Sequence, residues 1–134
     1  MFPRIREITD GFGTRLRISV EPRPTGALII VELPEEQGCP RALLDGYGVE
    51  TLWGFIMAAR LALPNPLPDE RVDGDYAALF QLRLKPAAAL VIVPAARVDA
   101  VMIASPLWDR LFAELCLVMA HAREIGRRAS SRMH

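Results

Sequence analysis

The fold is decided by residues 14–31, which read TRLRISVEPRPTGALIIV. Leu16, Ile18 and Val20 alternate with arginine and serine, the period of two that is typical of a strand with one buried face. Residues 27–31 are continuously apolar and mostly β-branched, which favours a strand covered on both faces. Two prolines and a glycine lie between these segments and predict a loop of several residues. The stretch therefore predicts a β-hairpin with one peripheral and one central strand.

The same pattern recurs in the second half of the chain. Residues 76–85 again alternate between apolar and polar side chains, and residues 89–93 are again apolar throughout. Each hairpin is followed by a predicted helix that opens on a Leu-Trp pair, and Trp53 and Trp108 are the only tryptophans. The spacing between matching segments drifts along the chain, so the sequence leaves open whether the two halves share an ancestor.

The first helix is predicted over residues 49–63, where apolar side chains recur at helical spacing before Pro64 ends the element. Its only polar side chains are Glu50, Thr51 and Arg60. A helix that is apolar nearly all round must be covered on more than one side. We therefore expect this helix either to be deeply buried or to meet a partner.

The second helix is predicted to begin at Ser105-Pro106, with the serine as N-cap and the proline at the first helical position. We expect it to end near Ile125, because Gly126 is a typical helix stop. Residues 127–134 are then a basic, frayed tail.

Three further segments complete the chain. Residues 41–45 fit a helical turn or an extra strand, and we favour the strand. Residues 95–104 fit a short helix or a strand, and both alternatives stay open. Residues 64–75 are rich in proline and acidic side chains and predict a loop between the halves.

Together these elements predict an α+β domain over residues 1–126. Its halves, 14–63 and 76–126, are each a ββα unit. The predicted strands form a mainly antiparallel sheet with both helices packed on one face. A chain of 134 residues is one domain by length and large enough to bury a core.

Composition limits the possible partners and location. With 51% hydrophobic and 24% charged residues the chain has the composition of a folded protein, and its formal net charge is zero. A neutral chain has no overall field to attract nucleic acid. The apolar stretches are too short to span a membrane, and no apolar segment follows the basic N-terminus, so we expect a cytoplasmic protein. Fifteen arginines against one lysine indicate a GC-rich bacterial coding sequence.

The sequence predicts no catalytic residue, no metal site and no cofactor, which argues against an enzyme. The acidic residues of the 64–75 segment lack the spacing of a calcium loop. Cys116 and His121 lie five residues apart on a helix and therefore point in different directions. No Gly-x-Ser-x-Gly nucleophile motif is present.

Nucleic-acid binding is also disfavoured. Arg15 and Arg17 on one predicted strand could join Arg83 and Lys85 on another, but only if the two strands share a sheet face. The alternating positions around them offer no aromatic side chain on which bases could stack.

The leading functional hypothesis is a non-catalytic protein–protein interaction domain, either a small homodimer or a subunit of a complex. Its basis is a surplus of apolar faces over what one sheet and two helices can cover alone. Phe55, Met57 and Leu117 are the predicted interface residues. In size and hairpin–helix layout the chain resembles bacterial secretion chaperones and immunity proteins, although it lacks the N-terminal helix of the secretion chaperones.

The alternative is a small-molecule-binding protein or enzyme with an apolar cavity between sheet and helices. Trp53 and Trp108 could line such a cavity, because aromatic side chains are common in ligand pockets. Arg60 could then orient an anionic ligand through its planar guanidinium.

Overall fold

The computed structural model describes residues 4–9, 11, 13–24, 26–95 and 99–132. The elements follow in the order β1 (Arg4–Thr9), β2 (Arg15–Arg23), β3 (Gly26–Glu32), β4 (Arg41–Leu44), α1 (Gly46–Ala62), β5 (Glu70–Val72), β6 (Ala78–Arg83), β7 (Ala89–Pro94), β8 (Val101–Ala104), a 3-10 turn η1 (Ser105–Leu107) and α2 (Trp108–Arg132). Each half of the chain therefore contains four strands followed by a helix.

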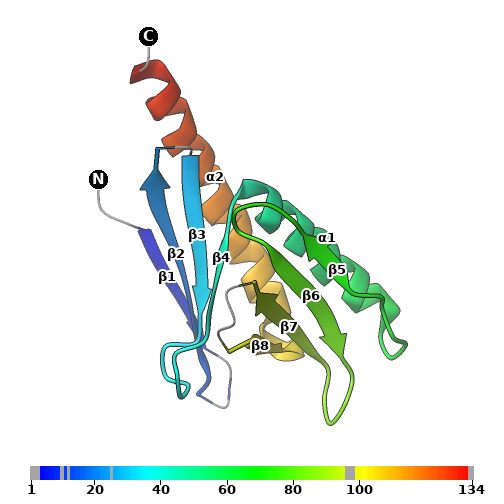
Figure 1. Ribbon diagram of the computed structural model, residues 1–134. Coiled ribbons are helices and arrows are strands. Elements are labelled where there is room, and N and C mark those ends of the chain that lie inside the picture. The colour runs from blue at the N-terminus through cyan, green and yellow to red at the C-terminus, as the bar shows by residue number, and fades with distance from the viewer. Residues whose placement is uncertain (1–3, 10, 12, 25, 96–98, 133–134) are drawn as a thin grey trace.

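The strands form two antiparallel sheets, which confirms the α+β class. Sheet A has the order β1-β2-β3-β4 and sheet B the order β5-β6-β7-β8. The sequence predicts a single sheet, but the described strands divide into two, and β4 contacts β7 without a hydrogen-bonded ladder. Figure 1 shows both helices behind the two sheets, so the helices lie on one side of the sheet layer.

The core lies between the inner faces of the sheets and the two helices. In sheet A, Val20, Ile29 and Leu44 form one cross-strand row that faces the helices. In sheet B, Leu82, Leu90 and Ile103 form a corresponding row. Helix α2 packs against β1, β2 and β3, whereas α1 packs against β5 and β6 and also contacts β3 and β4. Each sheet is thus covered mainly by the helix of the other half.

The sequence places the predicted strands well, and it places the start of α1 three residues too late. The strand favoured at residues 41–45 is confirmed as β4. Helix α1 begins at Gly46 because the Asp45 side chain accepts a hydrogen bond from the Gly48 N–H at 2.8 Å. This contact satisfies one of the free N–H groups of the first turn.

The start of the second helix differs from the prediction. Ser105 is not an N-cap, because η1 is preceded by Ala104 and has no side-chain cap. The segment left open before it is the strand β8. Helix α2 begins only at Trp108, after the 3-10 turn.

The end of the second helix was also predicted wrongly. Helix α2 continues through Gly126 to Arg132 rather than ending near Ile125. A glycine inside a helix costs about 1 kcal/mol relative to alanine, which neighbouring turns can outweigh. The predicted tail, residues 127–134, is therefore helical as far as Arg132, and its last two residues lie outside the described part.

Two strands were not predicted. Strand β5 lies inside the predicted loop 64–75 and pairs with β6. It has only three residues, of which Val72 alone is buried. In β1, Ile5 and Ile8 are three residues apart, so the period of two is missing from the sequence. Ile8 nevertheless faces the core, whereas Ile5 is exposed.

The apolar runs 27–31 and 89–93 match in sequence, but the matching residues point to opposite faces of their sheets. In β3 the core-facing residues are Ile29 and Val31, whereas in β7 they are Leu90 and Ile92. Aligning residues 27–31 with 89–93 would pair Ile29 with a residue on the opposite face. A slip of one residue exchanges the two faces of a strand, so the sequence match and the core-facing positions of β3 and β7 differ by one residue.

Candidate interaction surface

The three residues predicted to bind a ligand have different surroundings. Trp108 is buried in the core, where its indole Nε1–H donates to the carbonyl oxygen of Ile103 at 2.9 Å. Trp53 lies at the seam between the helices, with its ring centroid 6.2 Å from that of Phe112. Arg60 is at the same seam and forms an ion pair on the surface. The structure thus brings Trp53 and Arg60 to one seam and separates Trp108 from them, and their ligand-binding role stays a prediction.

The three predicted interface residues also separate. Phe55 is buried and packs against Phe80 of β6, with ring centroids 6.1 Å apart. It contributes to the core and is not a surface residue of this chain. Met57 is 54% exposed and Leu117 is 56% exposed, one on each helix. Two of the three predicted interface residues therefore lie on the surface.

Helix α1 presents a stripe of exposed residues away from the sheets. The stripe contains Tyr47, Glu50, Gly54, Met57 and Leu61, which recur every three or four residues. Tyr47 is 65% exposed and Leu61 is 86% exposed. The opposite face of the helix carries the buried residues, so the stripe points to solvent. We call it the α1 ridge.

Gly54 lies at the centre of the α1 ridge. A Cβ atom at this position would have no neighbouring atom within 4 Å. The large side chains of Tyr47 and Leu61 lie seven residues to either side of it. The ridge thus has a notch in the middle where another backbone could approach closely.

Helix α2 has a matching stripe of exposed residues, but their side chains are small. It consists of Asp109, Ala113, Cys116 and Ala120, all exposed. Leu117 lies beside it. We call these four residues the α2 groove, because their side chains are shorter than most of those on the neighbouring α1 ridge.

Ion pairs place the two stripes side by side. Near one end of the helix pair, the Arg60 guanidinium lies 2.5 Å from the Asp109 carboxylate. Toward the other end, the Arg123 guanidinium lies 3.8 Å from the Glu50 carboxylate. The helices therefore run antiparallel, with the α1 ridge and the α2 groove on the same outer surface. All four side chains are substantially exposed, so each pair contributes little to stability.

A stronger contact joins β1 to α2. The Arg6 Nε–H donates to a Glu114 carboxylate oxygen at 2.6 Å, and its Nη2 donates to the other oxygen at 3.2 Å. The hydrogen bond and the negative charge of Glu114 raise the pKa of Arg6. A two-point contact of this kind fixes geometry as well as charge.

The outer face of sheet A carries a ladder of alternating charges. The Arg17 guanidinium lies 3.2 Å from the Glu7 carboxylate on β1 and 3.5 Å from the Glu32 carboxylate on β3. The hydrogen bond to Glu7 raises the pKa of Arg17. Arg15 pairs with Glu7 as well, at 3.5 Å. These arginines are neutralised within the chain.

The basic patch considered from the sequence is not assembled. Arg15 and Arg17 lie in sheet A, whereas Arg83 ends a strand of sheet B and Lys85 follows it. The condition that the two strands share a sheet is therefore not met.

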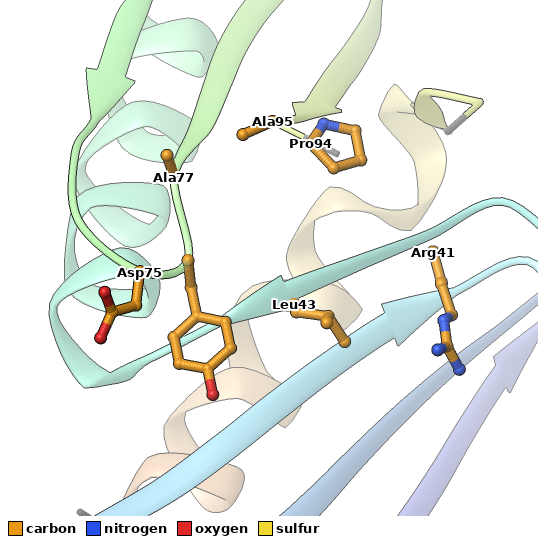
Figure 2. A pocket seen from close by; sticks show the side chains of 7 residues that line it. Arg41, Leu43, Asp75, Ala77, Pro94 and Ala95 are labelled. Atoms are coloured by element: carbon orange, nitrogen blue, oxygen red, sulfur yellow. The ribbon is translucent and has the colours of Figure 1, made fainter. Parts of the chain in front are cut away.

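Two clefts lie where the sheets approach each other. The smaller, of about 190 Å³, is lined by Arg41, Leu43, Asp75, Tyr76, Ala77, Pro94 and Ala95. Figure 2 shows Arg41 and Asp75 at opposite ends of it, with Leu43 between them. The larger, of about 460 Å³, includes Arg23, Asp45, Asp75, Tyr76, Met119 and Arg123 in its lining. Neither cleft is lined by the tryptophans.

Among the described residues, the His, Cys, Asp and Glu side chains are those that could bind a metal ion. No group of three or more His, Cys, Asp or Glu side chains within them is placed to hold a metal ion. Both cysteines are free and exposed. Over its described residues, neither helix combines the length and the apolar character needed to cross a bilayer.

The sequence missed most of the α1 ridge. The surplus of apolar residues in 49–63 predicted that this helix is deeply buried or meets a partner. Tyr47 falls outside the predicted helix, and Leu61 lies inside it without having been predicted as an interface residue. Only the orientation of α1 on sheet B distinguishes its core face from its outer face.

A scan against protein-family models, a search of curated proteins and a search of solved structures found no match to this chain.

Proposed function

We propose that the chain is a non-catalytic protein–protein interaction domain, a small bacterial cytoplasmic homodimer or subunit of a complex, with a chaperone-, adaptor- or immunity-like role. One observation carries the proposal. Among the described residues six large apolar side chains are exposed, and four of them, Tyr47, Met57, Leu61 and Leu117, are on the two helices. Exposed apolar side chains gathered on one face are typical of association surfaces.

A second copy of the chain suits this surface. The α1 ridge carries large side chains, whereas the α2 groove beside it carries small ones. In a two-fold dimer the ridge of each copy can lie in the groove of the other, which is the reciprocal contact that a two-fold axis requires. The Gly54 notch allows the helices to approach closely at such a crossing.

Sedimentation equilibrium on the purified chain tests this proposal. We expect a monomer–dimer equilibrium for the wild type. The double variant Met57→Glu/Leu61→Glu should be monomeric, because it places two charges in the apolar contact. Circular dichroism should show that the variant is folded, since both side chains are exposed.

Ile5→Glu is the matched control. The exposed fraction of Ile5, 57%, is close to the 54% of Met57, but Ile5 lies in β1 on the face opposite the core-facing Ile8. This variant should dimerise like the wild type. A wild type that remains monomeric at all concentrations, or equal dissociation of the Ile5 variant, would contradict the proposed surface.

The alternative function, small-molecule binding, is supported by the larger cleft rather than by the tryptophans. Its volume of about 460 Å³ is within the range of ligand pockets. Apolar side chains such as Met119 and the charged Arg123 and Asp75 share its lining. A thermal-shift screen of metabolites tests this alternative, because a ligand that binds the folded state raises the melting temperature. A hit that Tyr76→Ala abolishes would support it, and a screen without hits would count against it.

We also propose that the halves are an internal pseudo-repeat. Identical strand order and the swapped packing of the helices support it. From β4 onward the equivalent core positions keep a constant spacing: Leu44 and Ile103, Leu52 and Leu111, and Ile56 and Leu115 are each 59 residues apart.

A further inference from the structure

The outer face of sheet B, which points away from the helices, is largely apolar, and we call it the apolar floor. The strand register places nine side chains on it in three rows: Arg71, Leu79 and Val93; Gln81, Val91 and Met102; and Arg83, Ala89 and Ala104. Six of these nine side chains are apolar. Met102 is among the exposed large apolar side chains, Leu79 and Val93 are half-buried, and Ala89 and Val91 are buried.

The cations around this floor lack acidic partners. Of the arginine and lysine side chains that the structure describes, seven pair with carboxylates and Arg110 donates to the carbonyl oxygen of Thr9. The other four are Arg41, Arg71, Arg83 and Lys85. None of these four forms an ion pair within the described part of the chain.

Three of these four cations border the outer face of sheet B. Arg71 and Arg83 stand at opposite ends of its β5–β6 side. Lys85 follows β6, and Arg83 donates to its carbonyl oxygen at 3.0 Å and to the Met102 sulfur at 3.6 Å. Arg41 lies on β4 of sheet A, in register with Glu32, and lines the smaller cleft together with Pro94 at the end of β7 (Figure 2). The cations of sheet B therefore flank one side of the apolar floor.

The described acids near these cations do not form ion pairs with them. Asp69 accepts a hydrogen bond from Gln81 at 3.0 Å, and Asp75 lines the smaller cleft with Arg41 without forming an ion pair. On the outer face of sheet A, by contrast, Arg17 lies between two glutamates. Four of the five described cations without a carboxylate partner thus lie on sheet B or near it.

We propose that the outer face of sheet B binds an acidic, amphipathic segment of a protein partner. Apolar side chains of that segment cover Leu79, Val93 and Met102, and its carboxylates pair with Arg71 and Arg83. Carboxylates complement the guanidinium fork, and apolar contact supplies the larger part of the affinity. A nucleic acid fits less well, because the floor has no aromatic side chain on which bases could stack.

This site is independent of the proposed dimer. The α1 ridge and the α2 groove lie on the outer side of the helices, and the floor of sheet B lies on the opposite side of the molecule (Figure 1). A dimer formed through the helices would present two such floors. The monomeric variant Met57→Glu/Leu61→Glu should still bind, so that failure of one proposal leaves the other testable.

The test is fluorescence anisotropy with a labelled peptide of alternating glutamate and leucine. A peptide with lysine in place of glutamate, phosphatidylserine vesicles and single-stranded DNA serve as competing probes. We expect the acidic peptide to bind, and to bind more weakly as salt is added. Reversing two charges with Arg71→Glu/Arg83→Glu should weaken binding roughly tenfold. Arg123→Glu, an exposed cation on α2, is the matched control and should leave binding unchanged.

Two further measurements keep the test decisive even if the double variant does not fold. They are the salt dependence of peptide binding by the wild type and peptide binding by the variant Met102→Glu. Met102→Glu should weaken binding of the acidic peptide, because it places a like charge on the floor. No binding of the acidic peptide, equal binding of the lysine peptide, or no effect of these substitutions would overturn the proposal. Stronger binding of vesicles or of DNA would also overturn it, in favour of a membrane or a nucleic acid.

Discussion

Each tryptophan follows a leucine at the predicted start of a helix, but the two have different surroundings in the structure. Trp108 fills the core, and its indole N–H is bonded to Ile103. Trp53 packs between the helices, and its buried Nε1 has no hydrogen-bond partner among the described residues. If the halves are a repeat with the 59-residue spacing proposed above, Trp108 corresponds to Val49, one turn away from the Trp53 position. Similar residue pairs in the sequence thus occupy different places in the packing.

Replacing each tryptophan by phenylalanine should separate these roles. Trp108→Phe removes a buried hydrogen bond and leaves a cavity, so we expect it to lower the free energy of unfolding by about 2–4 kcal/mol. Trp53→Phe removes a polar atom that is already unpaired and should change the free energy of unfolding by less than about 1 kcal/mol. Urea denaturation of both variants provides the comparison. A larger loss for Trp53→Phe would show that the two environments are assigned wrongly.

The glycines of α1 offer a second comparison between single residues. Gly54→Ala adds a methyl group into open space and should stabilise the helix by up to about 1 kcal/mol. Gly48→Ala is the control, because its Cβ would lie 3.3 Å from the Leu44 side chain. Gly48→Ala should stabilise the protein less than Gly54→Ala does, or destabilise it. Chemical denaturation at a protein concentration that keeps the chain monomeric measures both, and equal effects would contradict the described packing of α1.

Among the elements, the sequence predicted those with a clear period and missed those defined by their neighbours. The alternation in 14–20 and 76–85 identified β2 and β6, and helical spacing identified both helices. Strands β1 and β5 could not be predicted, because they are short or irregular edges that exist through pairing with β2 and β6. Which residues of β3 and β7 face the core could not be predicted either, since an all-apolar run carries no period of two.

Strand β1 depends on α2 for its position, which makes the Arg6–Glu114 contact testable. Glu114→Ala removes the carboxylate that holds Arg6, so the amide hydrogens of β1 should exchange faster with solvent. Asp109→Ala, which removes the exposed partner of Arg60, is the control and should leave β1 protected. Hydrogen–deuterium exchange with mass spectrometry resolves the two outcomes. Unchanged exchange in the Glu114 variant would show that β1 is held by its ladder alone.

The pKa of Arg6 sets the pH range of this contact. Because Glu114 raises that pKa, the stabilisation is fully present below the ordinary pKa of arginine. It is lost only as the pH rises through the raised value, beyond the alkaline range in which proteins are usually studied. We therefore expect the protection of β1 to remain constant between neutral and moderately alkaline pH.

In the whole molecule, the exchange of helices explains why only two of the three predicted interface residues lie on the surface. Helix α1 covers the sheet of the second half, so Phe55 enters the core against Phe80. Met57 and Leu61 then face outward. The sequence could indicate that α1 has more apolar residues than one sheet needs, but which of them stay exposed depends on where sheet B lies. The apolar floor of sheet B, likewise, exists only once three strands are paired.

The most direct test of the helical interface is a distance measurement between two copies of the chain. Nitroxide labels on the exposed natural cysteines report it: Cys116 lies in the α2 groove, and Cys39 lies in the β3–β4 loop, 3.7 Å from the Glu32 carboxylate on the outer face of sheet A. Cys39→Ser leaves only Cys116 to label, and Cys116→Ser leaves only Cys39. Pulsed electron paramagnetic resonance should give a shorter distance between the two Cys116 labels than between the two Cys39 labels. A shorter Cys39 distance, or no coupling between the labels in either variant, would contradict a dimer formed through the helices.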